Sequence, residues 1–64
     1  MTCLTCLDIE WLITNGETSP AAIGHRTVSR PGATDRRAQN SLYEHLQRHD
    51  RLDLWTDLTR KAGA

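Results

Sequence analysis

Two pairs of side chains with the spacing of metal ligands stand far apart in the sequence. Cys3 and Cys6 form a Cys-x-x-Cys pair, and His45 and His49 form a His-x-x-x-His pair. Two thiolates three residues apart, or two imidazoles four apart on a helix, can each converge on one zinc ion. The 38 residues between the pairs exceed the linker of a single zinc finger. A shared zinc site therefore requires two separate helices to bring the pairs together.

The same four residues have simpler interpretations. The histidines can be polar residues that flank an apolar stripe, and the cysteines can be packing residues of an apolar N-terminal turn. A redox-active cysteine pair is a further alternative, because a helix N-terminus lowers the pKa of a thiol. The strands of a thioredoxin-like domain are not predicted, which weighs against it. Solvated or core side chains are our default, and zinc is the one cofactor kept as a hypothesis.

A second group of candidate residues is basic and lies in the middle of the chain. Acidic and basic residues cancel overall, but residues 1–24 carry three acids and no base, whereas residues 25–51 carry six arginines against three acids. Such a separation favours an anionic partner for the central segment. Arginine can contact guanine, and asparagine or glutamine adenine, in the major groove of DNA. The candidate DNA contacts are Arg26, Arg30, Thr34, Arg36, Arg37, Gln39 and Asn40, with Arg26 and Arg30 expected on phosphates.

Four short helices are predicted to position these side chains. The first, over about residues 5–14, has Leu4, Leu7, Trp11 and Leu12 as its apolar stripe, and Thr5 with Asp8 as a weak capping box. The second, over about 20–27, follows Ser19 as N-cap and Pro20 as the first helical residue. A turn is expected over residues 27–32, which contain Pro31-Gly32.

The third helix is predicted to begin after Thr34 and to run to about His49. Ser41 and Glu44 imitate a capping box, so a break near Asn40 is an alternative. A fourth helix follows Asp53 as its cap. Its apolar residues Leu54, Trp55 and Leu58 are a candidate interface for a homodimer; alternatively, Trp55 closes the core of the monomer.

The second and third helices satisfy most requirements of a helix-turn-helix. Gly24 supplies a small residue where two helices can touch, and the third helix opens with polar side chains almost all round. No segment alternates with the period of a strand. We therefore expect an all-α fold, a compact bundle of about four short helices containing a helix-turn-helix. It forms a single domain over 1–64, with its core over about 5–60 between an N-terminal cysteine turn and a C-terminal tail.

Several segments resemble the small helix-turn-helix proteins encoded by actinobacterial phages and their hosts. The resemblance covers roughly residues 6–58 and rests on Glu10-Trp11-Leu12, Gly16, Ser19-Pro20-Ala21-Ala22-Ile23 and Arg51-Leu52-Asp53-Leu54. Thr27 and Val28 depart from the family pattern, which has Leu and then Gly at these positions. A second departure lies near Thr34, where the family pattern has an aliphatic anchor. The resemblance implies regulatory DNA binding, with contacts carried over to Arg36, Arg37, Gln39 and Asn40.

Length and composition exclude several function classes. A chain of 64 residues allows one small core and leaves little room for a catalytic pocket, so we expect neither an enzyme nor a small-molecule substrate. The sequence contains no apolar run that could span a membrane and no signal peptide, so we expect a cytoplasmic protein. Our interpretation is a regulatory protein that binds duplex DNA with its third helix. The alternative is a protein-interaction module that binds or inhibits a host protein through the apolar helix face formed by Leu54, Trp55 and Leu58.

Overall fold

The computed structural model describes residues 3–62, which form four α-helices and no strand. The helices are α1 (Leu4–Thr14), α2 (Pro20–Thr27), α3 (Asp35–Arg48) and α4 (Leu52–Ala62). The prediction of a compact all-α bundle of four short helices is confirmed. None of these helices is long and apolar enough to cross a membrane.

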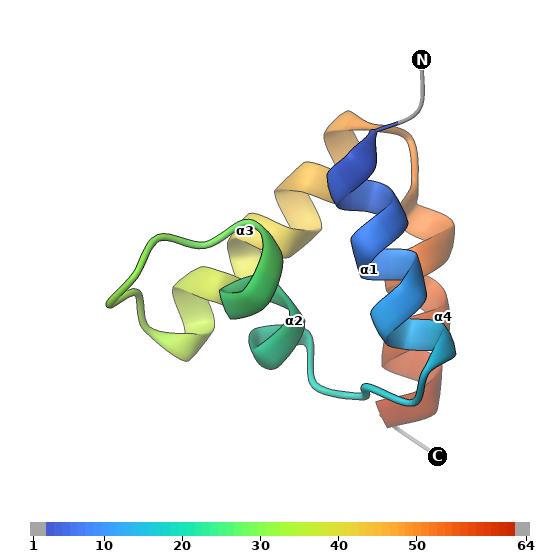
Figure 1. Cartoon of the computed structure of the whole chain (residues 1–64), viewed down its shortest axis with the longest axis horizontal. Helices are drawn as coiled ribbons and strands as arrows, with labels where there is room; N and C mark the ends of the chain where they lie inside the picture. Colours follow the sequence, from blue (N-terminus) through green and yellow to red (C-terminus); the bar gives the residue numbers. More distant parts are fainter. Residues whose placement is uncertain (1–2, 63–64) are drawn as a thin grey trace.

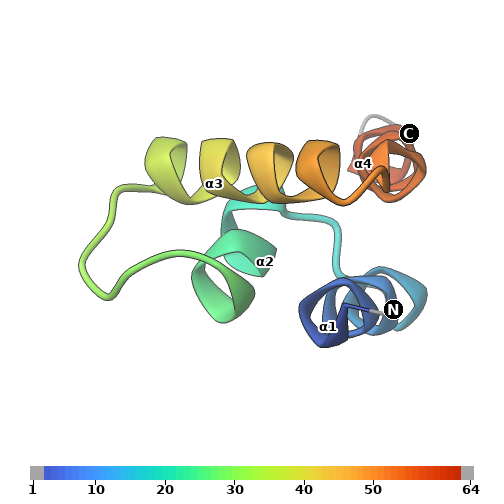
Figure 2. The same ribbon diagram turned by 90° about the horizontal axis from the view of Figure 1, so that it is seen from above.

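The longest helix, α3, organises the other three. Figure 1 shows α1 and α4 side by side near the C-terminal end of α3, while α2 lies against its N-terminal part. The connection between α2 and α3 projects away from α1 and α4 in both Figure 1 and Figure 2. The beginning of α1 lies close to the end of α3. The two ends of α3 therefore have different surroundings.

Side-chain caps define where α2 and α3 begin. The Ser19 hydroxyl accepts a hydrogen bond from the Ala22 N–H at 3.2 Å, and the Thr34 hydroxyl accepts one from the Arg37 N–H at 3.2 Å. Each cap satisfies a backbone donor that has no partner within the helix. Both caps were predicted and are confirmed. The alternative of a break near Asn40 is wrong, since α3 is continuous there.

Two residues in the left-handed region turn the chain at the ends of α1 and α3. Gly16 has a φ of 98°, and the following N–H of Glu17 bonds to the Leu12 carbonyl at 3.0 Å. Asp50 has a φ of 56°, and the Arg51 N–H bonds to the Leu46 carbonyl at 2.8 Å. Both arrangements satisfy carbonyls at a helix end and reverse the chain sharply. The turn at Asp50 places α4 alongside α1, and both helices run in the same direction (Figure 1).

The core is built by aliphatic side chains from all four helices. Its buried members are Ile9, Leu12, Ile13, Ile23, Leu42, Leu46, Leu54 and Leu58, with Val28 and Trp55 packed against them.

The buried face of α1 differs from the predicted one. Leu4, Leu7 and Trp11 are 77%, 44% and 61% exposed, whereas the inward stripe consists of Cys6, Ile9 and Ile13 together with Leu12. Both stripes have the spacing i, i+3, i+7, so periodicity alone does not distinguish them. Only the packing of α1 against α2 and α4 selects the face that carries Cys6.

The predicted starts of α1 and α4 also need correction. Cys3 is the N-cap of α1 and makes no side-chain cap, so the predicted capping box of Thr5 and Asp8 is not used. The helix α4 begins at Leu52, which places Asp53 in its first turn. There the Asp53 carboxylate accepts a hydrogen bond from the Arg51 guanidinium at 3.1 Å.

Two of the three residues predicted as a dimer interface on α4 are buried inside the monomer, and the third is half-buried. Leu54 is 4% and Leu58 is 0% exposed, and Trp55 packs against the core. The Trp55 ring also makes an edge-on contact with Tyr43, at a centroid distance of 5.1 Å. These three side chains connect α4 to α1 and α3, as in the alternative that assigns Trp55 to the monomer core.

The helices α2 and α3 cross at their closest point at Gly24. A Cβ atom on Gly24 would overlap the Ala38 carbonyl oxygen, and Ala38 is itself fully buried. Because the obstacle is backbone, a larger residue at either position would push the two helices apart. The small residue expected at this helix contact is confirmed.

We predict that Gly24→Ala lowers the free energy of unfolding by about 1–3 kcal/mol, because the added methyl group overpacks the helix crossing. Urea denaturation followed by circular dichroism measures this change. Gln39→Ala is the control, an exposed change on α3 expected to alter stability by no more than about 0.5 kcal/mol. Equal midpoints for the two variants would contradict the close approach.

The two tryptophans offer a matched test of which helix faces are buried. Trp55→Ala is expected to cost about 2–3 kcal/mol of stability, less than a fully buried ring, because Trp55 is only half-buried. Trp11→Ala is expected to stay within about 0.5 kcal/mol, since most of that ring is in solvent. Thermal unfolding of both variants decides; a larger loss for Trp11→Ala would mean that the buried face of α1 is assigned wrongly.

Candidate functional site

The four predicted zinc ligands lie together where α1 begins and α3 ends. The Nε2 atom of His45 is 3.5 Å from the Cys3 sulfur and 3.6 Å from the Cys6 sulfur. Donor atoms of Cys3, Cys6 and His49 all lie within 4.8 Å of one another. Two pairs separated by most of the chain thus form one cluster, which we call the thiol–imidazole cluster.

Helical geometry accounts for the arrangement within each pair. Cys3 is the N-cap of α1 and Cys6 lies one turn further along the helix, so both sulfurs face the same side. His45 and His49 are one turn apart at the C-terminal end of α3, and their rings stack at 4.4 Å with a tilt of 32°. Cys6 is 2% exposed, whereas His49 is exposed. The cluster therefore extends from the core to the solvent.

The surroundings of the cluster shift the pKa values of Cys3, Cys6 and His45. The backbone N–H of Cys6 lowers the pKa of the Cys3 thiol, while burial raises the pKa of the Cys6 thiol. Burial also lowers the pKa of His45, and the nearby His49 and Arg48 act in the same direction. The unprotonated imidazole of His45 is thus favoured, which is the form that accepts hydrogen bonds and binds metals.

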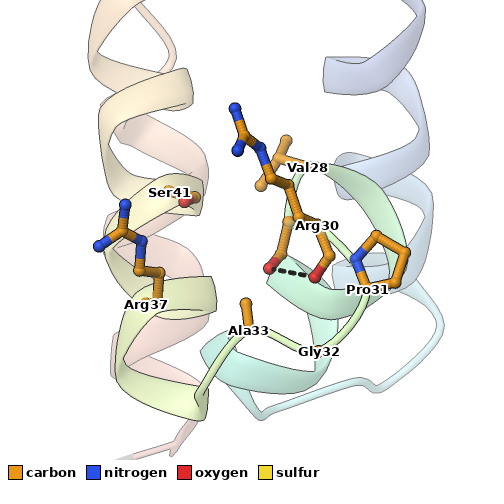
Figure 3. A pocket seen from close by; sticks show the side chains of 8 residues that line it. Val28, Arg30, Pro31, Gly32, Ala33, Arg37 and Ser41 are labelled. Carbon is orange, nitrogen blue, oxygen red and sulfur yellow. Dashed lines mark hydrogen bonds between the residues drawn. The ribbon is translucent and has the colours of Figure 1, made fainter.

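The opposite end of α3 carries an open pocket lined by two arginines. The pocket has a volume of about 490 Å³ and lies between α3 and the connection that precedes it. Figure 3 shows Arg30 from the connection and Arg37 from α3 on its two sides, extending in the same direction. The lining residues are Val28, Ser29, Arg30, Pro31, Gly32, Ala33, Arg37 and Ser41. None of these side chains is acidic, so the pocket has a net positive charge.

The polar residues that open α3 continue this basic surface. Arg36, Arg37, Gln39 and Asn40 are exposed, as is the cap Thr34. Among the ion pairs of residues 3–62, none involves an arginine of this surface. We call the surface formed by Arg30, Thr34, Arg36, Arg37, Gln39 and Asn40 the α3 face. It contains six of the seven predicted DNA contacts.

The seventh predicted contact, Arg26, has different neighbours. It lines shallow depressions together with Trp11 and Leu12 of α1, close to Asp8 in one and Glu17 in the other. Arg26 is therefore separate from the pocket between Arg30 and Arg37. The sequence pattern grouped it with Arg30 because it could not show that Arg26 faces α1, whereas Arg30 lies on the connection that follows α2.

Sequence reasoning missed the contacts that hold the α3 face in place. His25 at the end of α2 bonds to the Asp35 carboxylate at 2.9 Å, across the connection. Ser41 also lines the pocket, whereas the sequence analysis considered it only as part of a capping box. These residues are polar and ordinary in spacing, so no sequence signal marks them.

The arginine that follows α3 is neutralised. Arg51 pairs with Glu10 of α1 at 3.5 Å and with Asp53 at 3.1 Å. The pairing raises the pKa of Arg51 and lowers that of Asp53, chiefly through their mutual hydrogen bond. Free basic charge on α3 is thus concentrated towards its N-terminal end, although Arg48 also lies exposed near its other end.

Comparisons with protein-family models, with curated proteins and with solved structures found no match to this chain.

Proposed function

We propose that this chain is a helix-turn-helix domain that binds duplex DNA, with the first half of α3 in the major groove. The observation that supports this most is the pair Arg30 and Arg37 on the two sides of one pocket that has no acidic lining residue (Figure 3). Neither guanidinium group has an ion-pair partner among residues 3–62. Two such groups, held by separate backbone segments, suit contacts to phosphate oxygens. We assign the phosphate contacts to Arg30 and Arg37, and leave Arg26 outside the interface.

The order of side chains along α3 supports reading of bases. Arg36, Gln39 and Asn40 are exposed beside the phosphate-binding arginines, and each can form paired hydrogen bonds with a base edge. Ala38 and Leu42, on the other side of the helix, are buried against the domain. A helix anchored on one face and polar on the other at its N-terminal end is the geometry of a recognition helix.

The connection between the helices is longer than the usual turn of this motif. It runs from Val28 to Thr34, whereas three or four residues are typical. The extra residues form the wall of the pocket and carry Arg30 outwards. The helix crossing does not depend on them, since Gly24 and Ala38 set it. The longer connection is therefore compatible with the proposal and adds a cationic contact.

We expect Arg37→Ala to weaken DNA binding and to reduce the slope of log Kobs against log salt by about one, because one phosphate contact is lost. Arg30→Ala should act in the same way, and the double variant should lose about two. Fluorescence anisotropy with a labelled duplex, over a series of salt concentrations, measures these slopes. Arg60→Ala on α4 is the matched control, with the same change in charge far from the α3 face. An equal effect of Arg60→Ala would refute the assignment.

Sequence preference should depend on Asn40. After selection of a preferred duplex from a random pool, Asn40→Ala is expected to cost about 1–3 kcal/mol on that duplex and much less on unrelated DNA. Gln47→Ala is the control because Gln47 lies two turns further along the same side of α3 and is also exposed. The proposal predicts no change of preference for Gln47→Ala; if both variants keep the wild-type preference, α3 does not read bases in this way.

A second candidate function is favoured by the outer face of α1. Leu4, Leu7 and Trp11 form an exposed apolar stripe on one side of this helix. Such a stripe suits a protein partner better than DNA. If the chain is a protein-interaction module, this stripe is its binding surface, and the α4 residues Leu54, Trp55 and Leu58 are not. The Trp11→Ala variant, expected to fold normally, isolates this surface in any binding assay.

A further inference from the structure

We infer that the thiol–imidazole cluster is a structural zinc site that joins the start of α1 to the end of α3. The ligands are the sulfurs of Cys3 and Cys6, Nε2 of His45 and a ring nitrogen of His49. This inference does not depend on DNA binding, because the cluster and the α3 face are separate. Arg36 and His49 are about 20 Å apart along the helix, at 1.5 Å per residue.

The two distances between His45 and the sulfurs match tetrahedral coordination. Zinc lies about 2.3 Å from sulfur and about 2.0–2.1 Å from imidazole nitrogen, so a tetrahedron sets each sulfur-to-nitrogen separation at about 3.6 Å. His45 Nε2 is 3.5 Å and 3.6 Å from the two sulfurs. The donor atoms of Cys3, Cys6 and His49 also lie within 4.8 Å of one another, so each of the two histidines lies within reach of both sulfurs.

Hydrogen bonding alone explains this geometry poorly. In either neutral tautomer, Nε2 carries one lone pair or one hydrogen, so it can make only one well-aligned hydrogen bond to a sulfur. Two sulfurs stand at nearly equal distance from His45 Nε2. A metal ion between the three atoms would account for both distances at once. A fourth donor, His49, faces the same space from the next turn of α3.

Charge and burial favour zinc at this place. When zinc binds, each cysteine forms a sulfur–zinc bond and its thiol proton passes to the solvent, so two thiolates cancel the two positive charges of the ion. A neutral site can extend into the core at Cys6 without the cost of a buried net charge. The two histidines bind as neutral imidazoles and do not alter this balance.

A metal site would also compensate for the small hydrophobic core of this chain. Only 12 of its 64 residues are Leu, Ile, Val or Phe, and domains of this size often depend on a metal or a disulfide. The two cysteines are free thiols. Zinc would fasten α1 to α3 at a point where the two helices share few other contacts, since α1 packs mainly on α2 and α4.

The test uses the full chain, reduced and freed of metal by chelation, titrated with Zn²⁺ and separately with Co²⁺. We expect one equivalent to bind, and each tenfold rise in free zinc above Kd to raise Tm by roughly 5–10 °C. Cobalt should give the intense visible bands of a tetrahedral site and a thiolate-to-cobalt charge-transfer band in the near ultraviolet. Failure to bind stoichiometrically, or a cobalt spectrum without the charge-transfer band, would overturn the inference.

Variants of exposed or half-exposed ligands keep the test independent of folding. His49→Gln should leave the metal-free Tm unchanged and weaken zinc binding by at least roughly 10- to 100-fold, the loss caused even by removing a partner outside the ligand shell. Cys3→Ser should reduce the charge-transfer band of the cobalt form by about half, because one of two thiolates is lost. His25→Gln, a histidine outside the cluster, should keep the full zinc response. Wild-type affinity in both His49→Gln and Cys3→Ser would exclude the site.

Discussion

The close contact between α2 and α3 at Gly24 and Ala38 is the constraint on which the rest of the structure depends. It fixes how α2 and α3 cross, and therefore the two helix ends that the connection between them must join. His25 and Asp35 then close the connection, and Arg30 meets Arg37 across the pocket. With α2 seated in this way, Ile23 joins Leu42 and Leu46 in the core, against which α1 and α4 pack. The same crossing therefore builds the core and orients the α3 face.

The helix α3 divides into three parts with different tasks. Its first turns are polar and exposed, its middle supplies buried leucines, and its last turn presents two imidazoles to the thiols of α1. This division explains how a neutral chain can present a basic surface. Arg51 is paired with acids, Arg26 lies beside α1, and Arg30, Arg36 and Arg37 are without ion-pair partners among residues 3–62. Net charge is a poor guide here, because the unpaired charges decide what the surface attracts.

Local interactions were predicted well from the sequence, and choices made by packing were not. The caps at Ser19 and Thr34 depend on hydrogen bonds within a few residues, and both were predicted correctly. Each short spacing implied a pair of side chains on one side of a helix, but only the packing of α1 near the end of α3 brings the cysteines to the histidines. The buried face of α1 was not predictable, because Leu4-Leu7-Trp11 and Cys6-Ile9-Ile13 have the same spacing. Leu54 and Leu58 were assigned to an interface since no local signal shows whether an apolar stripe meets its own chain or another.

The most direct test of the account is amide NMR spectroscopy of the protein titrated with a short duplex of the selected sequence. The account predicts that the shifted or broadened signals belong to the connection from Val28 to Thr34 and to the first half of α3, whereas signals of the thiol–imidazole cluster stay in place. Binding whose signals map to Leu4, Leu7 and Trp11 on α1, or the absence of any shift at low salt, would contradict the claim that the α3 face binds DNA.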